Sequence, residues 1–309
     1  MGETEKIIGH KQATQFLTAL ERAGLDPELA SKATDGMAGR IASEKMINIL
    51  LFGNSAPIIP EPREHQVARE IMGENFFGFQ EAFDIWRAYY PNMMRDEHNS
   101  LQEIPYERKT LEECAKTHVL VLHARESYNG VILTIENMLH IIIERIRRQG
   151  EGIPESPYDI LSSIRGNDYE DLRSGWALVA KNISPVGTEV YSALTFENGS
   201  LRIDHQKIAD PNHRLCWLPS VSIYFYILCT CYYARNMRLL ENELTWTSTS
   251  SSSSYCSCSR MIGTFKDFIP TVKTAVKTAD FDEQCSDARN AGFTLGVLPG
   301  RCSGRNLKV

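Results

Sequence analysis

Residues 215–234 contain no charged side chain, so any fold of this chain must remove this run from water. Its length is close to that of a helix that spans a bilayer. Pro219 and several hydroxyl side chains make it too polar for a membrane span, and we expect a helix buried on most sides. Pro219 and Ser220 are placed to begin this helix, and Arg235 and Arg238 to occupy its last turn.

The composition is that of a globular protein, and the helices and strands expected along the chain favour an α+β fold. Of 309 residues, 42% are hydrophobic and 23% are charged. A net charge of −6 and a pI near 5.8 argue against sequence-independent binding of nucleic acid, because that binding needs Lys and Arg to neutralise phosphates. Arg145, Arg147 and Arg148 cluster where a predicted helix ends, and cations there oppose the helix dipole.

The N-terminal residues lack the apolar segment of a signal peptide, so we expect a cytoplasmic protein, with surface display by another route left open. In that setting the cysteines are expected to be free thiols. Two C-x-C pairs without a matching histidine do not predict a zinc site, and no cofactor is expected. The eight cysteines are at positions 114, 216, 229, 231, 256, 258, 285 and 302.

Residues 1–150 are predicted to form a mainly helical module with one strand. The hydrophobic spacing of residues 8–52 predicts two or three amphipathic helices. A proline-rich linker is expected at 57–66, a strand at 118–122 and a long apolar helix at 133–148.

Aromatic side chains are concentrated between positions 76 and 90. They could stack on a base or a sugar, but their spacing fits a helix that buries one face, so we expect core packing. His118 and His123 flank the predicted strand, where a structural role is expected. The aromatic residues are Phe76, Phe77, Phe79, Phe83, Trp86, Tyr89 and Tyr90.

Glycine and proline between residues 150 and 157 mark the expected domain boundary, after which residues 158–309 form a second domain. A short apolar strand is predicted at 176–180. Asn198 and Gly199 form the dipeptide that most often turns a hairpin.

The run 247–259 consists of Ser and Thr with Tyr255, Cys256 and Cys258. A serine-rich linker would have this composition. The run continues without a break into residues 261–265, which alternate like a strand, and this favours a structured surface. Ser and Tyr suit an adaptable binding surface, because Tyr gives contact area and Ser gives hydrogen bonds.

The end of the chain resembles the RxNxGFRL ending of C-type-lectin-fold domains of the formylglycine-generating-enzyme type. Thr294 stands where that ending normally has Arg. The variable ligand-binding proteins of diversity-generating retroelements are built on this fold. The matching residues are Arg289, Asn290, Gly292, Phe293 and Leu295.

A second resemblance covers most of the chain. The strings FFGFQEAF, LQEIPYERKTLEECAKTHVLVL and SGWALVAKNISPVGTEV are similar to uncharacterised proteins of bacteria with reduced genomes, in which a lectin-like tail is also present. This resemblance names an architecture and no activity.

The retroelement resemblance implies a C-type-lectin-like domain with a mixed, mostly antiparallel sheet and a hypervariable ligand-binding face. Adenine-directed mutagenesis of AAC codons can reach every residue of 247–259, but neither Trp246 nor Met261. We expect the face to be exposed, and Phe265 and Phe268 to line the face or belong to the core. The framework residues that we expect to be packed are Trp246, Ile262, Gly292, Phe293 and Leu295. The candidate face residues are Thr247, Thr249, Ser251, Ser253, Tyr255, Ser257, Ser259, Phe265 and Phe268.

Two other functions stay open: an interaction or scaffold protein with a fixed partner, and a degenerate enzyme of the formylglycine-generating type. A catalytic role has little support, because the sequence has no G-x-S-x-G nucleophile elbow, P-loop or dinucleotide fingerprint. Asp280, Asp282, Glu283 and Asp287 are expected to form a solvated acidic loop, since the glycine-spaced pattern of a calcium loop is missing. We therefore expect a binding protein for an unknown protein or surface ligand.

Overall fold

The computed structural model describes residues 61–88, 101–127, 131–148, 174–185, 188–197, 200–204, 206, 216–253, 256–266, 268–276, 294–297 and 300–301. All of them belong to one compact unit, Ile59–Val309. The helices predicted within residues 8–52, the acidic loop and most of the lectin-like ending lie outside the described residues.

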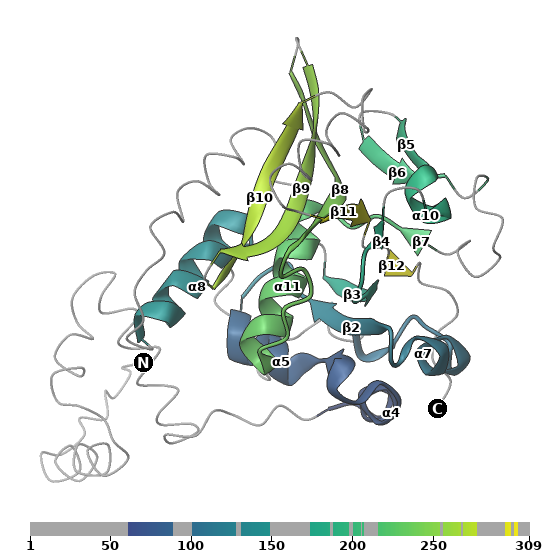
Figure 1. Cartoon of the computed structure of the whole chain (residues 1–309). Helices are drawn as coiled ribbons and strands as arrows, with labels where there is room; N and C mark the ends of the chain where they lie inside the picture. Colours follow the sequence, from purple (N-terminus) through teal and green to yellow (C-terminus); the bar gives the residue numbers. More distant parts are fainter. Residues whose placement is uncertain are drawn as a thin grey trace, which may run out of the picture. The chain divides into compact units, whose positions relative to one another are not determined.

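The described residues form an α+β fold, in agreement with the fold class expected from the predicted helices and strands (Figure 1). The strands are β1 (Phe76–Phe77), β2 (His118–His123), β3 (Gly175–Ala180), β4 (Ser184–Pro185), β5 (Leu194–Glu197), β6 (Ser200–Ile203), β7 (Cys216–Trp217), β8 (Glu243–Ser253), β9 (Cys256–Lys266), β10 (Ile269–Val276), β11 (Thr294–Val297) and β12 (Gly300–Arg301). The helices are α4 (Arg63–Met72), the 3₁₀ turn η1 (Gly73–Asn75), α5 (Phe79–Trp86), α7 (Arg108–Cys114), α8 (Ile135–Arg148), α10 (Glu189–Ser192) and α11 (Val221–Arg235).

The first sheet has the strand order β1-β2-β3-β12-β7. β2 and β3 are antiparallel along their whole length, from the pair His118 and Ala180 to the pair His123 and Gly175. β1 is the edge strand next to β2 and runs parallel to it, with Phe76 opposite Leu120 and Phe77 opposite Val121. Every residue of β2 is buried, which explains why its sequence is a nearly continuous apolar run.

The second sheet has the order β10-β9-β8-β11-β4 and is mostly antiparallel, with β11 parallel to β8. β5 and β6 form a separate antiparallel hairpin. Glu197 pairs with Ser200 in this hairpin, so the predicted turn residues Asn198 and Gly199 connect two paired strands.

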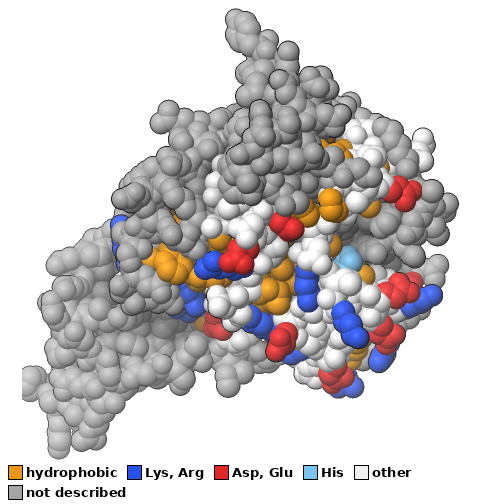
Figure 2. Space-filling model, viewed as in Figure 1, with side chains coloured by type: hydrophobic (Ala, Val, Ile, Leu, Met, Phe, Trp, Pro, Cys, Tyr) orange, Lys and Arg blue, Asp and Glu red, His pale blue; other side chains and the backbone are white. Residues whose placement is uncertain are grey.

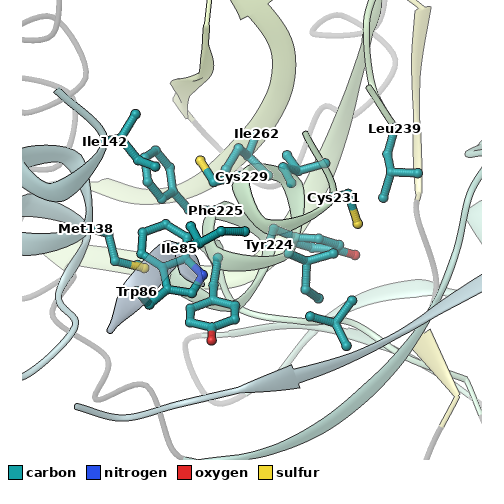
Figure 3. Packing of buried hydrophobic residues seen from close by; sticks show 14 of the residues in the cluster. Ile85, Trp86, Met138, Ile142, Tyr224, Phe225, Cys229, Cys231, Leu239 and Ile262 are labelled. Carbon is teal, nitrogen blue, oxygen red and sulfur yellow. The ribbon is translucent and has the colours of Figure 1, made fainter. Parts of the chain in front are cut away.

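Helix α11 contacts β2 of the first sheet and β8, β9 and β10 of the second, and packs on α5 and α8 (Figures 1 and 3). Apart from Ile223, which is partly buried, all its side chains from Val221 to Cys231 are buried, and this confirms the prediction of a core helix. Ser220 begins the helix by accepting a hydrogen bond from the Ile223 N–H, and Asn236 ends it in the left-handed conformation. Among the helices of the described residues, none combines the length and the apolar character needed to cross a membrane.

The core contains residues from both sides of the boundary predicted near residue 150. Trp86 of α5 stacks on Tyr226 of α11 with ring centroids 4.9 Å apart, and Met138 and Ile142 of α8 belong to the same cluster (Figure 3). Since β2 and β3 also pair across that boundary, the described residues before and after it form one structural unit and not two.

Two local predictions need correction. The segment predicted as one helix from residue 76 begins instead with strand β1, and α5 starts only after Gly78. Part of the predicted linker is helical, because α4 starts at Arg63 directly after Pro62. The aromatic residues from Phe76 to Trp86 are buried, as expected for core packing, while Tyr89 and Tyr90 lie outside the described residues.

Candidate functional site

Strands β8 and β9 form a long antiparallel hairpin that contains most of the serine-rich run. Beyond its base, Ser250 pairs with Ser259, Ser251 with Cys258, Ser252 with Ser257, and Ser253 with Cys256. The alternative of an unstructured linker is therefore wrong for the described part of this run. We call residues 250–253 and 256–259 the distal hairpin.

The base of the hairpin is anchored in the core. Trp246 pairs with Met261 across the two strands, and Ile262 is the next residue of β9. All three side chains are buried, which confirms the expected packing of Trp246 and Ile262. Core packing therefore holds the base of the hairpin in place.

The expectation that the whole run is exposed is wrong at Thr247 and Thr249. Their exposed fractions are 0% and 1%. This part of β8 lies against the start of α11, whose first backbone N–H groups have no acceptor within the helix. The Thr249 Oγ1 atom accepts a hydrogen bond of 2.9 Å from the Val221 N–H, which draws this strand against the helix.

Phe265 and Phe268 are also placed by the core. Phe265 is buried, with its ring centroid 5.2 Å from that of Tyr232. Phe268 is partly buried against the core, and its carbonyl accepts a 2.9 Å hydrogen bond from the Tyr233 hydroxyl. The open choice between face and core is therefore decided as core for Phe265.

The remaining candidate residues keep their place in the distal hairpin. Ser251 and Ser253 lie on β8, and Ser257 and Ser259 lie on β9. Tyr255 falls between the two strands and outside the described residues.

A bulge separates the base from the distal hairpin. After the pair Trp246 and Met261, the next pair is Ser250 and Ser259, so three residues of β8 lie opposite the single residue Arg260. Such bulges bend a strand and change the direction of the residues beyond the bend. Sequence alone gave no sign of this bulge, because its cause is the contact with α11, far away in the chain.

The distal hairpin contains no Asp, Glu, Lys or Arg side chain. Residues 247–259 include no ionisable side chain other than Tyr255, Cys256 and Cys258. At the base, partial burial raises the pKa of Glu243. Tyr224 of α11 forms a hydrogen bond with Thr245 at this base. Burial raises the pKa of the Tyr224 hydroxyl, and the hydrogen bond only partly offsets this effect.

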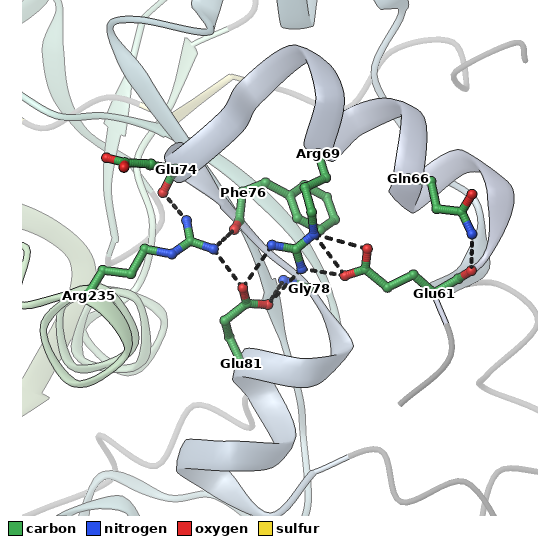
Figure 4. A network of polar contacts seen from close by, with 8 residues as sticks. All are labelled: Glu61, Gln66, Arg69, Glu74, Phe76, Gly78, Glu81 and Arg235. Atoms are coloured by element: carbon green, nitrogen blue, oxygen red, sulfur yellow. Dashed lines mark hydrogen bonds and ion pairs between the residues drawn. The ribbon is translucent and has the colours of Figure 1, made fainter. Parts of the chain in front are cut away.

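A second polar group, missed by the sequence reasoning, joins α4, α5 and α11 (Figure 4). The guanidinium of Arg69 binds both Glu61 and Glu81, and that of Arg235 binds Glu81 at 2.7 Å and the Phe76 carbonyl at 2.8 Å. Every charge has an opposite partner within the group, so its role is to hold these elements together.

The described surface shows no single-signed field in the view of Figure 2, where acidic and basic side chains lie next to one another. On α7, for example, Arg108 pairs with Glu112 and Lys109 with Glu113. Within the described ranges, no three His, Cys, Asp or Glu side chains come together as a metal site would require. Comparison of the chain with protein-family models, with curated proteins and with solved structures found no match.

Proposed function

We propose that this chain is a ligand-binding protein that uses the distal hairpin as its contact surface. One observation carries the proposal: a buried base and a bulge fix the hairpin, while the strands beyond them are paired ladders of Ser and Cys. A surface can change its side chains freely only where the fold does not depend on them. The proposed contact residues are Ser251 and Ser253 of β8 and Ser257 and Ser259 of β9, with Tyr255 kept as a prediction from the sequence. The pairing register places the two β8 residues on one face of the ladder and the two β9 residues on the other, so the proposal uses both faces of the distal hairpin.

The composition of the distal hairpin suits recognition by hydrogen bonds. Serine hydroxyls donate and accept without bulk, as in antibody loops rich in Ser and Tyr. Since no residue of 247–259 is Asp, Glu, Lys or Arg, binding is expected to depend little on ionic strength. This distinguishes the hairpin from a surface that steers a charged partner.

We further propose that the hairpin is diversified by a retroelement on a C-type-lectin-like fold. Supporting this origin, Trp246 and Met261, which adenine-directed changes cannot produce, form a buried cross-strand pair at the base. The codons that would vary therefore lie beyond the pair that would stay fixed. In this proposal the chain is a binding protein without catalytic activity.

Selection from a library tests the binding surface. All eight positions of the distal hairpin would be randomised on displayed protein, and binders selected against an immobilised globular protein such as lysozyme. We expect folded binders from this library. A matched library that randomises Trp246, Thr247, Thr249, Met261 and Ile262 should yield few folded members, because these side chains are buried. Equal loss of folding in both libraries would contradict the proposal.

Sequencing of the genomic locus tests the origin. A reverse transcriptase gene and a template repeat that differs from the codons of 247–259 only at adenines are expected nearby. Without them, a fixed-partner interaction protein would be the remaining explanation of the same hairpin.

A further inference from the structure

The bulge of β8 is held by the segment that begins α11. The Ser248 N–H donates to the Pro219 carbonyl at 3.0 Å, and the Val221 N–H donates to Thr249 Oγ1 at 2.9 Å. Thr249 in turn donates its own N–H to Thr247 Oγ1 at 3.3 Å. Strand β8 thus exchanges its pairing with β9 for bonds to the start of α11, and then returns to β9 at Ser250.

The bond from Val221 to Thr249 satisfies a backbone donor that the helix itself leaves unpaired. Val221 is the first residue of α11, so its N–H has no acceptor within the helix. The Ser220 hydroxyl is already engaged with the Ile223 N–H at 3.4 Å. Both Val221 and Thr249 are 1% exposed, so water does not replace the Thr249 hydroxyl. Loss of that hydroxyl would leave a buried donor without an acceptor.

We infer that Thr249 is a positioning residue: its bond to the start of α11 fixes the direction in which the distal hairpin leaves the core. This inference rests on the proposed function, because it treats the distal hairpin as the contact surface. It moves Thr249, with Thr247, from the variable face to the framework. A binding protein of this kind needs such a residue, since a contact surface that swings loses affinity to the cost of ordering it.

Three variants of the full chain separate positioning from stability. Thr249→Val removes the hydroxyl and keeps the shape, Thr249→Ser keeps the hydroxyl, and Ser220→Ala weakens the same helix start without touching the hairpin. Residual dipolar couplings of backbone amides would be measured in each. The orientation of β2, β3 and α11 gives the reference, and the amides of the distal hairpin are compared with it.

In the parent, Thr249→Ser and Ser220→Ala, the hairpin couplings should fit the reference orientation. In Thr249→Val they should depart from it while the core still fits. A Thr249→Val hairpin that keeps its orientation would overturn the inference. No ligand takes part, so this outcome is independent of whether the hairpin binds one.

The parent protein supplies a second test if Thr249→Val does not fold. In native-state hydrogen exchange, the Val221 amide and the amides of the distal hairpin should open together, with opening constants equal within roughly threefold and the same dependence on denaturant. A Val221 amide that exchanges only with the global core, while the hairpin opens separately, would contradict the coupling.

Discussion

The indole N–H of Trp86 donates a hydrogen bond of 2.8 Å to the hydroxyl of Thr230, although 144 positions separate the two residues in sequence. The Thr230 hydroxyl donates its own proton to the Tyr226 carbonyl at 2.7 Å. Trp86 and Thr230 are both fully buried. This short chain of bonds joins α5 to α11 in the middle of the core.

Replacement of Thr230 by Val should lower the free energy of unfolding by about 1–3 kcal/mol, because the buried Trp86 N–H loses its acceptor. Urea denaturation measures this change. Thr230→Ser, which retains the hydroxyl, is the control. In a double-mutant cycle with Trp86→Phe, the two losses should be smaller together than their sum. Strict additivity would show that the bond contributes nothing.

The second prediction concerns how the stabilisation by Glu81 depends on pH. Burial favours the neutral form of Glu81, but its bonds from Arg69 and Gly78 outweigh that effect and lower its pKa below 4.5. A lowered carboxyl pKa stabilises the fold above the unfolded value, and the benefit disappears as the pH falls through the folded value. Glu81→Gln should therefore cost about 1.5–3 kcal/mol at about pH 6 and much less at about pH 3.

Urea denaturation of parent and variant at both pH values provides the measurement. Glu112→Gln is the control, because Glu112 forms a pair with Arg108 that is exposed on both sides and should contribute little at any pH. A Glu81→Gln deficit that persists undiminished in acid would show that the Arg69 and Arg235 bonds do not act through the charge.

The thiols of Cys229 and Cys231 give a third prediction. Burial raises the pKa of both, and the neighbouring Cys231 adds to the rise at Cys229, so both are protonated at neutral pH. Since only the thiolate reacts readily, neither residue should be alkylated in the native protein. Both should be modified in denaturant without prior reduction. Peptide mass spectrometry distinguishes this from a disulfide, which would stay unmodified until reduced.

Gly263, at the base of the hairpin, has φ +153°, and a Cβ there would clash with the Glu243 carbonyl oxygen. Gly263→Ala should cost at least about 3 kcal/mol, since it combines backbone strain with overlap of two strands. Gly73 also has positive φ, +56°, but a Cβ would meet no heavy atom of the described residues within 4 Å. Gly73→Ala should thus cost only about 1–2 kcal/mol. Equal costs in thermal denaturation would contradict the close approach at Gly263.

Sequence reasoning located the elements whose cause is local. The uncharged run around Tyr224 and Cys229 could only be a buried helix or a membrane span, and Ser220 marked its start. The apolar run of β2 likewise predicted a buried strand.

It failed where the cause is a distant partner. Thr249 reads as one more hydroxyl in a serine-rich run, and only the Val221 N–H, 28 positions away, makes it part of the framework. Arg235 was expected to oppose a helix dipole, but its guanidinium also binds Glu81 of α5, 154 positions away. Sequence reasoning also did not predict that the two expected domains share one sheet, because neither the β2 segment nor the β3 segment shows by its own sequence which strand it pairs with.

Thermal unfolding of two variants beside the parent tests the display of the distal hairpin most directly. Replacing Ser251, Ser253, Ser257 and Ser259 together by Thr should change stability by no more than about 0.5 kcal/mol for each residue, as surface substitutions do. Trp246→Ala should cost about 3–5 kcal/mol, because it empties an aromatic core site. If the quadruple variant unfolds while Trp246→Ala stays close to the parent, the fold depends on the distal hairpin, and that hairpin is not a displayed surface.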